Sequence, residues 1–212
     1  MTLDITVLIP ALNEAKTIAG VVQVASDAGF KNILVVSDGS SDETAQRART
    51  AGAEVLELHP NRGKGGAVKA GALKASTAYL LLLDADLLNL KVQHLKAMLE
   101  PVLQKRADTT AGLFVGGGII TDFGNRATPQ WSGQRVIPRA TILAAKDLET
   151  AGYGIEIAIN DQIASENLRL EYIDLVGVSQ VIKEQKLGLV AGIARRIKMY
   201  WQILRYSTSK RH

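Results

Sequence analysis

Two aspartates stand at the end of a run of leucines, in the segment LLLDADL (81–87). An unpaired carboxylate beside a core strand is costly, so Asp84 and Asp86 need water, a cation or a metal as a partner. Side chains two residues apart in an extended segment point to the same side, so these two suit one hard divalent cation. The alternative is that they cap a turn after the strand.

A lysine among glycines is the second chemical feature. Lys64 lies in NRGKGGA (61–67), at the expected start of a helix. Backbone N–H groups at a helix start and a lysine ammonium both bind phosphate, so this segment favours a phosphate site. The alternative is a solvated turn.

Two further polar segments complete the set, PALNEA (10–15) and SDGSSDET (37–44). A carboxylate such as Asp38 at a strand end can accept hydrogen bonds from a base or from ribose hydroxyls. Gly39 permits a sharp turn directly after it. The alternative is that Asp38 caps the following helix.

Apolar segments rich in Val, Ile and Leu precede these loops and alternate with helix-like segments. This pattern is typical of α/β proteins with a mostly parallel sheet covered on both faces, which bind ligands at the carboxyl edge of the strands. The expected strands are ITVLI (5–9), NILVV (32–36), EVLEL (54–58) and YLLLL (79–83); the expected helices are 15–29, 41–52 and 64–76.

The second half of the chain has a less regular pattern. We expect a helix over 91–106, a strand over 112–118 and then a long irregular stretch over 120–139 that is polar and contains Gly and Pro. Loops of this length often carry function. A helix over 154–166, strands over 170–176 and 177–182 and a final helix over 187–206 complete the chain.

Composition indicates an ordinary globular protein of 212 residues, 47% hydrophobic and 22% charged. The start MTLDITVLIP lacks the features of a signal peptide, and no window has the about 20 apolar residues of a membrane span, so we expect a cytoplasmic protein. There is no cysteine, which restricts any metal to oxygen or imidazole ligands.

In this order, PALNEAKTI, VVSDGSSDET, NRGKGGAVKAG and LLLDADL resemble the nucleotide-sugar-binding half of GT-A glycosyltransferases, particularly family 2. The resemblance covers about residues 5–90. It implies the GT-A fold, a UDP-sugar or GDP-mannose as donor, and Mg²⁺ or Mn²⁺ to neutralise the departing diphosphate. It also implies roles for particular residues. The base and ribose pocket would be lined by Pro10, Ala11, Leu12 and Glu14, and Asp38 would bind the base. Lys64 would lie near the diphosphate, and Asp84 and Asp86 would bind the metal.

WSGQRVIPR (131–139) and GYGIEIAIN (152–160) resemble the acceptor region of polyprenyl-phosphate sugar transferases and glucosyl-3-phosphoglycerate synthases. Glu156 would then face the sugar or acceptor, as a general base for inversion or a hydroxyl ligand in a retaining reaction; alternatively it only favours its helix dipole. Arg135 and Arg139 would hold an anionic acceptor, or are ordinary surface or salt-bridged arginines.

One position departs from this pattern. The glucosyl-3-phosphoglycerate relatives have a late histidine that completes the metal site, and the equivalent place here has Gln180. An amide oxygen is a poorer Mn²⁺ ligand than imidazole, so we expect weak metal binding or a water as the last ligand.

Basic charge is concentrated at the C-terminal end, where residues 183–212 contain eight Lys or Arg and one Glu. Apolar side chains recur there at helical spacing, among them Val190, Ile193, Ile197 and Leu204. Such a segment is typical of a peripheral membrane helix, and the alternative is a helix docked on the sheet or in a homodimer contact. No nucleic-acid motif accompanies the charge, so we expect no nucleic-acid partner.

We therefore expect a single GT-A domain over 1–212, with a nucleotide-sugar-binding half (1–90), an acceptor-side half (91–186) and a basic amphipathic helix (187–212). The expected function is metal-assisted sugar transfer to a phosphorylated or polyprenyl-phosphate acceptor, in the cytoplasm or at the inner face of the membrane. Asp86, Glu156 and Arg135 are the expected catalytic residues. The alternative is a non-catalytic module that binds a nucleotide sugar or docks on a membrane enzyme.

Overall fold

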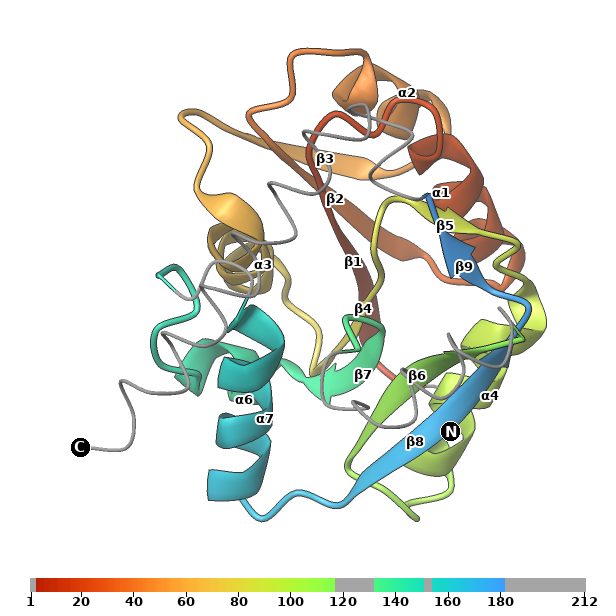
Figure 1. Cartoon of the computed structure of the whole chain (residues 1–212), viewed down its shortest axis with the longest axis vertical. Coiled ribbons are helices and arrows are strands. Elements are labelled where there is room, and N and C mark those ends of the chain that lie inside the picture. The colour runs from red at the N-terminus through yellow and green to blue at the C-terminus, as the bar shows by residue number, and fades with distance from the viewer. Residues whose placement is uncertain (1–2, 117–131, 151–153, 182–212) are drawn as a thin grey trace.

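The structure is a computed structural model that describes residues 3–116, 132–150 and 154–181 (Figure 1). Its first half is a repeated strand–helix pattern, as the sequence predicts. Four parallel strands lie in the order β3-β2-β1-β4, so their carboxyl ends share one edge of the sheet. The elements of this half are β1 (Ile5–Ala11), α1 (Ile18–Asp27), β2 (Asn32–Asp38), α2 (Thr44–Thr50), β3 (Glu54–Leu58), α3 (Gly63–Lys74), β4 (Tyr79–Leu82) and β5 (Leu87–Leu88).

The second half extends the same sheet. Its strands continue the order as β7-β6-β8, so the main sheet has seven strands in the part of the chain that is described. β7 runs antiparallel to both β4 and β6, whereas β6 and β8 are parallel. The elements are α4 (Val92–Leu103), β6 (Thr109–Val115), β7 (Arg135–Pro138), α6 (Arg139–Ala144), α7 (Ile155–Ser165), β8 (Leu170–Val176) and β9 (Ser179–Gln180).

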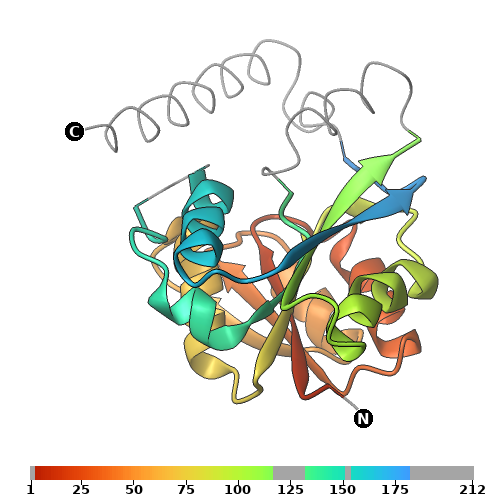
Figure 2. The same ribbon diagram turned by 90° about the horizontal axis from the view of Figure 1, so that it is seen from below.

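Helices cover both faces of the sheet, which explains the continuous apolar strands. Alternate residues of β1 point to opposite faces: Val7 packs with residues of α1 and α4, and Leu8 packs with residues of α3, α6 and α7. Figure 2 shows these two helical layers on either side of the strands. The result is a three-layer α/β fold with a mostly parallel central sheet, as expected.

Two expectations for the second half are wrong. The stretch 120–139 is not irregular throughout, because residues 135–138 form β7 in the interior of the sheet and α6 follows directly. A charged first residue hides this strand in the sequence, and in the fold Arg135 is buried. β6 also begins earlier than expected, at Thr109, because the buried hydroxyls of Thr109 and Thr110 donate to the carbonyls of Val136 and Met98.

A small antiparallel pair links the two halves near the carboxyl edge. β5 pairs with β9 so that Leu87 lies opposite Gln180, and Val181 N donates to the carbonyl of Asp86 (3.2 Å). None of the helices in the described residues has the length and apolar character needed to span a bilayer. The expected final helix and residues 120–131 of the long loop lie outside the described residues.

Candidate active site

Hydrogen bonds that involve side chains join the loop after β1 to the loop after β2. Asn13 Oδ1 accepts from Ser41 N (2.8 Å), and Asn13 N donates to Ser40 Oγ (3.1 Å). Glu14 N donates to Thr44 Oγ1 at the start of α2 (2.8 Å). The segment 10–15 is therefore fixed against the segment 37–44, and it presents Leu12, which is 46% exposed.

Asp38 is buried at the end of β2 and joins its own loop to the next one. Its Oδ1 accepts from Arg62 N (2.7 Å), and its carbonyl accepts from Asn61 Nδ2 (2.6 Å). Asp42, rather than Asp38, accepts from the first amide of α2. Gly39 has φ +74°, and a Cβ there would lie 3.2 Å from Asn61 Cβ, so this turn suits glycine.

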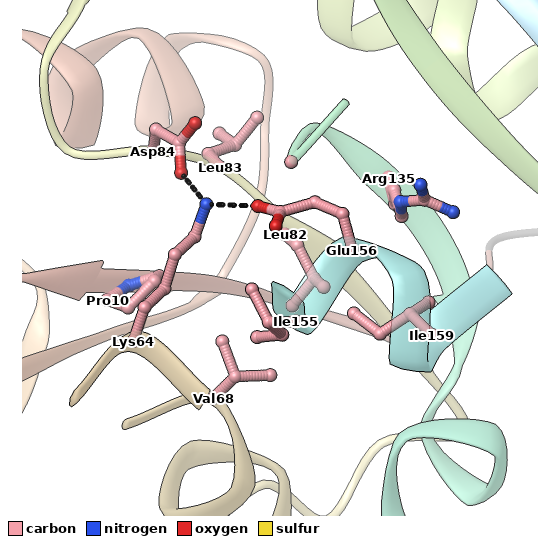
Figure 3. A pocket seen from close by; sticks show the side chains of 11 residues that line it. Pro10, Lys64, Val68, Leu82, Leu83, Asp84, Arg135, Ile155, Glu156 and Ile159 are labelled. Carbon is pink, nitrogen blue, oxygen red and sulfur yellow. Dashed lines mark hydrogen bonds and ion pairs between the residues drawn. The ribbon is translucent and has the colours of Figure 1, made fainter. Parts of the chain in front are cut away.

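Lys64 lies between two carboxylates from opposite halves of the chain (Figure 3). Its Nζ is 2.8 Å from Asp84 Oδ1 and 2.8 Å from Glu156 Oε1. Asp84 follows β4, and Glu156 occupies the first turn of α7. Both carboxylate side chains are only 15% exposed, so the three groups form a partly buried ion-pair cluster.

The cluster keeps Lys64 charged. Burial by itself would lower the pKa of the Lys64 ammonium, but Asp84 and Glu156 together raise it well above its ordinary value. Pro10, Val68, Leu82 and Ile159 line the same small cavity, which has a volume of about 10 Å³, close to the room that one water molecule requires. With these ion pairs in place, the cavity has no space for a phosphate group or a sugar.

The second oxygen of Asp84 is held by two amides. Gln134 Nε2 donates to Asp84 Oδ2 (2.9 Å), and Gln180 Nε2 donates to the same atom (2.6 Å). Gln180, the position of the expected departure, therefore contacts one of the two aspartates. Asp86 lies in the following turn, 9% exposed, and its carbonyl accepts from Val181 N, directly after β9.

Arg135 lies on the other side of Glu156 and is fully buried. Its Nε donates to the Ser132 carbonyl (2.9 Å), and its Nη1 donates to Asn160 Oδ1 in α7 (2.7 Å). Burial lowers the pKa of the Arg135 guanidinium to about 10, although nearby Glu156 acts in the opposite direction. The alternative that Arg135 is a surface residue is wrong.

Arg139 does not belong to this group. It lies at the opposite end of β7, where its N donates to Ala78 O just before β4 and its Nε donates to Ala72 O in α3 (2.7 Å). Because β7 is extended over residues 135–138, the two arginines are separated by about the length of that strand. The expectation that both hold one acceptor does not fit this geometry.

The residues present fit a hard divalent cation. Asp84 and Asp86 supply carboxylate oxygens, and the amide of Gln180 has an oxygen as well as its NH₂ group. In the described ranges there is no group of three or more His, Asp or Glu side chains suited to a metal. Two carboxylates are nevertheless sufficient for Mg²⁺ when substrate phosphates supply further ligands.

Sequence reasoning missed Gln134, Asn160 and Asn61. Gln134 lies directly before β7, Asn160 lies within α7, and Asn61 links two loops. The sequence signal for Gln134 is its position directly before Arg135 in SGQRVIPR. That position indicates a site residue only when residues 135–138 are known to form a strand paired with β4.

Comparison with known proteins identifies the family. Residues 6–162 match the model of glycosyl transferase family 2. The chain belongs to this family. Among curated relatives, the glycosyltransferase AglJ of Haloferax volcanii is 42% identical over 83 residues, which cover 39% of this chain and 27% of the relative. The dolichyl-phosphate beta-glucosyltransferase of Drosophila melanogaster is 40% identical over 102 residues, covering 40% and 31%. The chain thus spans about a third of the length of these relatives.

Solved structures show the same fold. Glucosyl-3-phosphoglycerate synthase from Mycobacterium tuberculosis, in complex with Mn²⁺, uridine-diphosphate-glucose and phosphoglyceric acid, aligns with a TM-score of 0.68 at 22% identity, over 84% of this chain and 72% of that chain. This family 2 chain therefore has the GT-A fold that the motifs predict.

Proposed function

We propose that this family 2 chain transfers a sugar from a nucleotide diphosphate sugar to a phosphorylated or lipid-linked acceptor, with Mg²⁺ or Mn²⁺ at the donor. The observation that carries the proposal is the position of Lys64 between Asp84 and Glu156, at the edge where the strand-end loops meet. A lysine at a helix start is suited to bind phosphate. The proposed donor-binding residues are Pro10, Ala11, Leu12, Glu14, Asp38, Gly39 and Lys64.

Lys64 would change partners when the donor binds. The small cavity beside it excludes a phosphate while both ion pairs are formed. A diphosphate brings its own negative charge to the ammonium, so it can replace one or both carboxylates. This exchange would free Asp84 Oδ1 for a metal and Glu156 for the sugar or the acceptor.

Asp84 and Asp86 would hold the metal, with Gln180 or water as a further ligand. When bound, the metal supplies Lewis-acid neutralisation of the nucleoside diphosphate as the glycosidic bond breaks. The chain holds these ligands in place through the β5–β9 pair, which ties the Asp86 turn to Gln180. The protein thus contributes orientation as well as charge.

The acceptor would bind beside Glu156. The guanidinium of Arg135 is fully buried behind Glu156 and would act by its positive charge, which favours an anionic acceptor nearby, rather than by direct contact. Two findings support a phosphorylated acceptor: one relative is named for dolichyl phosphate, and the solved synthase holds phosphoglyceric acid. Glu156 would act as a general base or as a hydroxyl ligand, and the anomeric configuration of the product distinguishes inversion from retention.

Calorimetric titration of UDP and of GDP, each with and without Mn²⁺, tests the donor and metal parts together. We expect UDP binding that depends on Mn²⁺ in the wild-type chain and is lost in Asp86→Ala. Asp27→Ala, at an exposed carboxylate of α1 that accepts from Gln23, is the matched control and should bind like wild type. Nucleotide binding without transfer or donor hydrolysis in a separate activity assay would favour the nucleotide-binding form of the non-catalytic alternative. No binding of either nucleotide would contradict the proposed transfer and favour the form of that alternative in which the chain docks on a membrane enzyme.

Contact of residues 187–212 with an anionic membrane surface is proposed as well, because the segment is basic and has amphipathic spacing. Cosedimentation with anionic vesicles should exceed that with neutral vesicles, and it should fall when the chain is truncated after Leu189. Equal cosedimentation of the full and truncated chains would contradict a membrane role and favour a docked helix or a dimer contact.

A further inference from the structure

Gln134 is a buried amide, 1% exposed, whose two functional atoms both contact Asp84. Its Nε2 donates to Asp84 Oδ2 (2.9 Å), while its Oε1 accepts from Asp84 N (3.1 Å). Leu82 lies opposite Arg135 in the β4–β7 pair, so Gln134 and Asp84 lie just past the last paired residues. The side-chain amide has the same donor and acceptor as a peptide group, and it extends the antiparallel ladder by one step.

The backbone of Gln134 is itself fixed. Its carbonyl accepts from Gly112 N in β6 (2.8 Å), and its N donates to Ser132 Oγ (3.3 Å). Gly112 has no room for a side chain, because a Cβ there would lie 2.5 Å from Leu175 Cδ1 and 3.3 Å from Gln134 Cβ. The amide therefore approaches Asp84 from a rigid part of the sheet.

The two oxygens of Asp84 are consequently used differently. Oδ2 accepts from the amides of Gln134 and Gln180, whereas Oδ1 faces the cation Lys64. Gln180 is exposed, so water can replace its hydrogen bond, but the buried bond from Gln134 has no such substitute.

We infer that Gln134 is a positioning residue that reserves Oδ2 of Asp84 for protein amides and presents Oδ1 alone to a cation. The cation is the Lys64 ammonium in this structure and, under the proposed function on which this inference rests, the divalent metal of the donor complex. Coordination through one oxygen suits the strict octahedral geometry of Mg²⁺, whereas Ca²⁺ readily takes both oxygens of a carboxylate. Gln134 thereby favours Mg²⁺ over Ca²⁺.

The test measures metal affinity in the presence of saturating UDP, by the electron paramagnetic resonance signal of free Mn²⁺ and by competition with Mg²⁺ and Ca²⁺. Residues that orient metal ligands typically change affinity by about 10- to 100-fold when removed. In Gln134→Met we expect Mg²⁺ affinity to fall by about tenfold and Ca²⁺ affinity to fall clearly less. In Gln23→Met, which removes an exposed amide that donates to Asp27 in α1, both affinities should stay within about twofold of wild type, as is usual for a surface substitution outside the site.

Two results would overturn the inference. One is a Mg²⁺ affinity of Gln134→Met within about twofold of wild type, since that lies well below the usual effect of such residues. The other is an equal fall for both metals, because simple loss of fold would lower both affinities without changing their ratio. If the wild-type chain shows no metal binding with UDP, the proposed function fails and the inference falls with it; a wild-type site with an unchanged variant rejects the inference alone.

A measurement on the wild-type chain covers the case in which Gln134→Met does not fold. The side-chain NH₂ protons of Gln134 should exchange slowly with solvent, both free and with Mg²⁺ and UDP bound. Rapid exchange in the bound state would show that the amide leaves Asp84 when the site is occupied, which contradicts a positioning role.

Discussion

The two halves of this molecule bring their site residues to the same edge by different means. In the first half β1 to β4 are parallel, and Asp38, Lys64 and Asp84 each lie at or after the carboxyl end of one of these strands. In residues 109–181 the site residues come from the start of an antiparallel strand, the first turn of a helix and a two-residue strand: Gln134, Arg135, Glu156 and Gln180. Parallel repeats therefore place functional loops together through connectivity alone, whereas the second half depends on the register of β7 against β4.

Glu156 of the second half contacts Lys64 of the first half directly. In Glu156→Gln we expect the turnover number to fall by about 10²- to 10⁴-fold, the usual contribution of a general acid or base, while metal-dependent UDP binding stays within about threefold. The difference arises because the amide keeps the shape of the side chain but can neither accept a proton nor carry charge. Steady-state transfer assays and calorimetry on the same preparations measure both quantities.

Glu100→Gln is the matched control, since this exposed side chain of α4 bonds only locally to Gln104 among the contacts described. It should leave turnover unchanged. Full activity in Glu156→Gln would mean that Glu156 only orders α7 and Lys64, and the acceptor half would lose its proposed chemical role.

Lys64 belongs to the first half of the chain but is held by carboxylates from both halves. In Lys64→Met we expect Mn²⁺ to bind about tenfold more tightly in the absence of nucleotide, because Asp84 Oδ1 loses its competing cation. UDP binding should weaken by at least about tenfold, because a charge-assisted contact to phosphate is lost. Calorimetry with Mn²⁺ alone and with UDP measures the two changes.

Lys74→Met removes the same charge from the same helix but at an exposed pair with Glu54. Neither affinity should change by more than a small factor, since exposed pairs contribute little. Similar effects in both variants would attribute the change to net charge rather than to the cluster.

Helix α3 packs closely on β1 at Gly71, whereas Gly20 of α1 has open space, so these two glycines separate the effect of packing from that of backbone flexibility. A Cβ at Gly71 in α3 would lie 2.3 Å from Leu8 Cδ1, so Gly71→Ala should lower the free energy of unfolding by about 1–3 kcal/mol through overpacking. Gly20 in α1 has open space, so Gly20→Ala should raise it by about 0.4–1 kcal/mol. Urea unfolding tests both; equal effects in the two helices would contradict the role given to packing on β1.

The smallest expected effect concerns the outer edge of the second half, where Asp108 before β6 accepts from Arg169 before β8. Hydrogen bonds from Arg169 lower the pKa of Asp108 to about 2. The stabilisation is therefore complete above the unfolded-state pKa of about 4 and is lost as the pH falls from about 4 to 2. The loss should be slight because both side chains are partly exposed. Asp108→Asn should remove this part of the pH dependence of unfolding, and an unchanged profile would assign it to other carboxylates.

The accuracy of the sequence analysis differs between the halves for a physical reason. In the first half, strand positions and the shared edge follow from apolar runs, since β1, β2 and β4 are largely buried on both faces. In the second half, β7 begins with a charged residue, and β6 begins with two threonines whose hydroxyls are satisfied inside the core. Hydropathy does not reveal such residues, because their burial depends on partners distant in the chain.

The sequence alone determined the fold class, the family and the order of the strand-end motifs, because these depend on local periodicity and on short patterns of chemical groups. Only the tertiary structure decided how those groups pair: Lys64 with Glu156, Gln134 and Gln180 with one oxygen of Asp84, and Arg135 with Asn160. These contacts join residues 25 to 96 positions apart. They exist because an antiparallel strand and a two-residue pair set the register, and no local pattern in the sequence specifies that register.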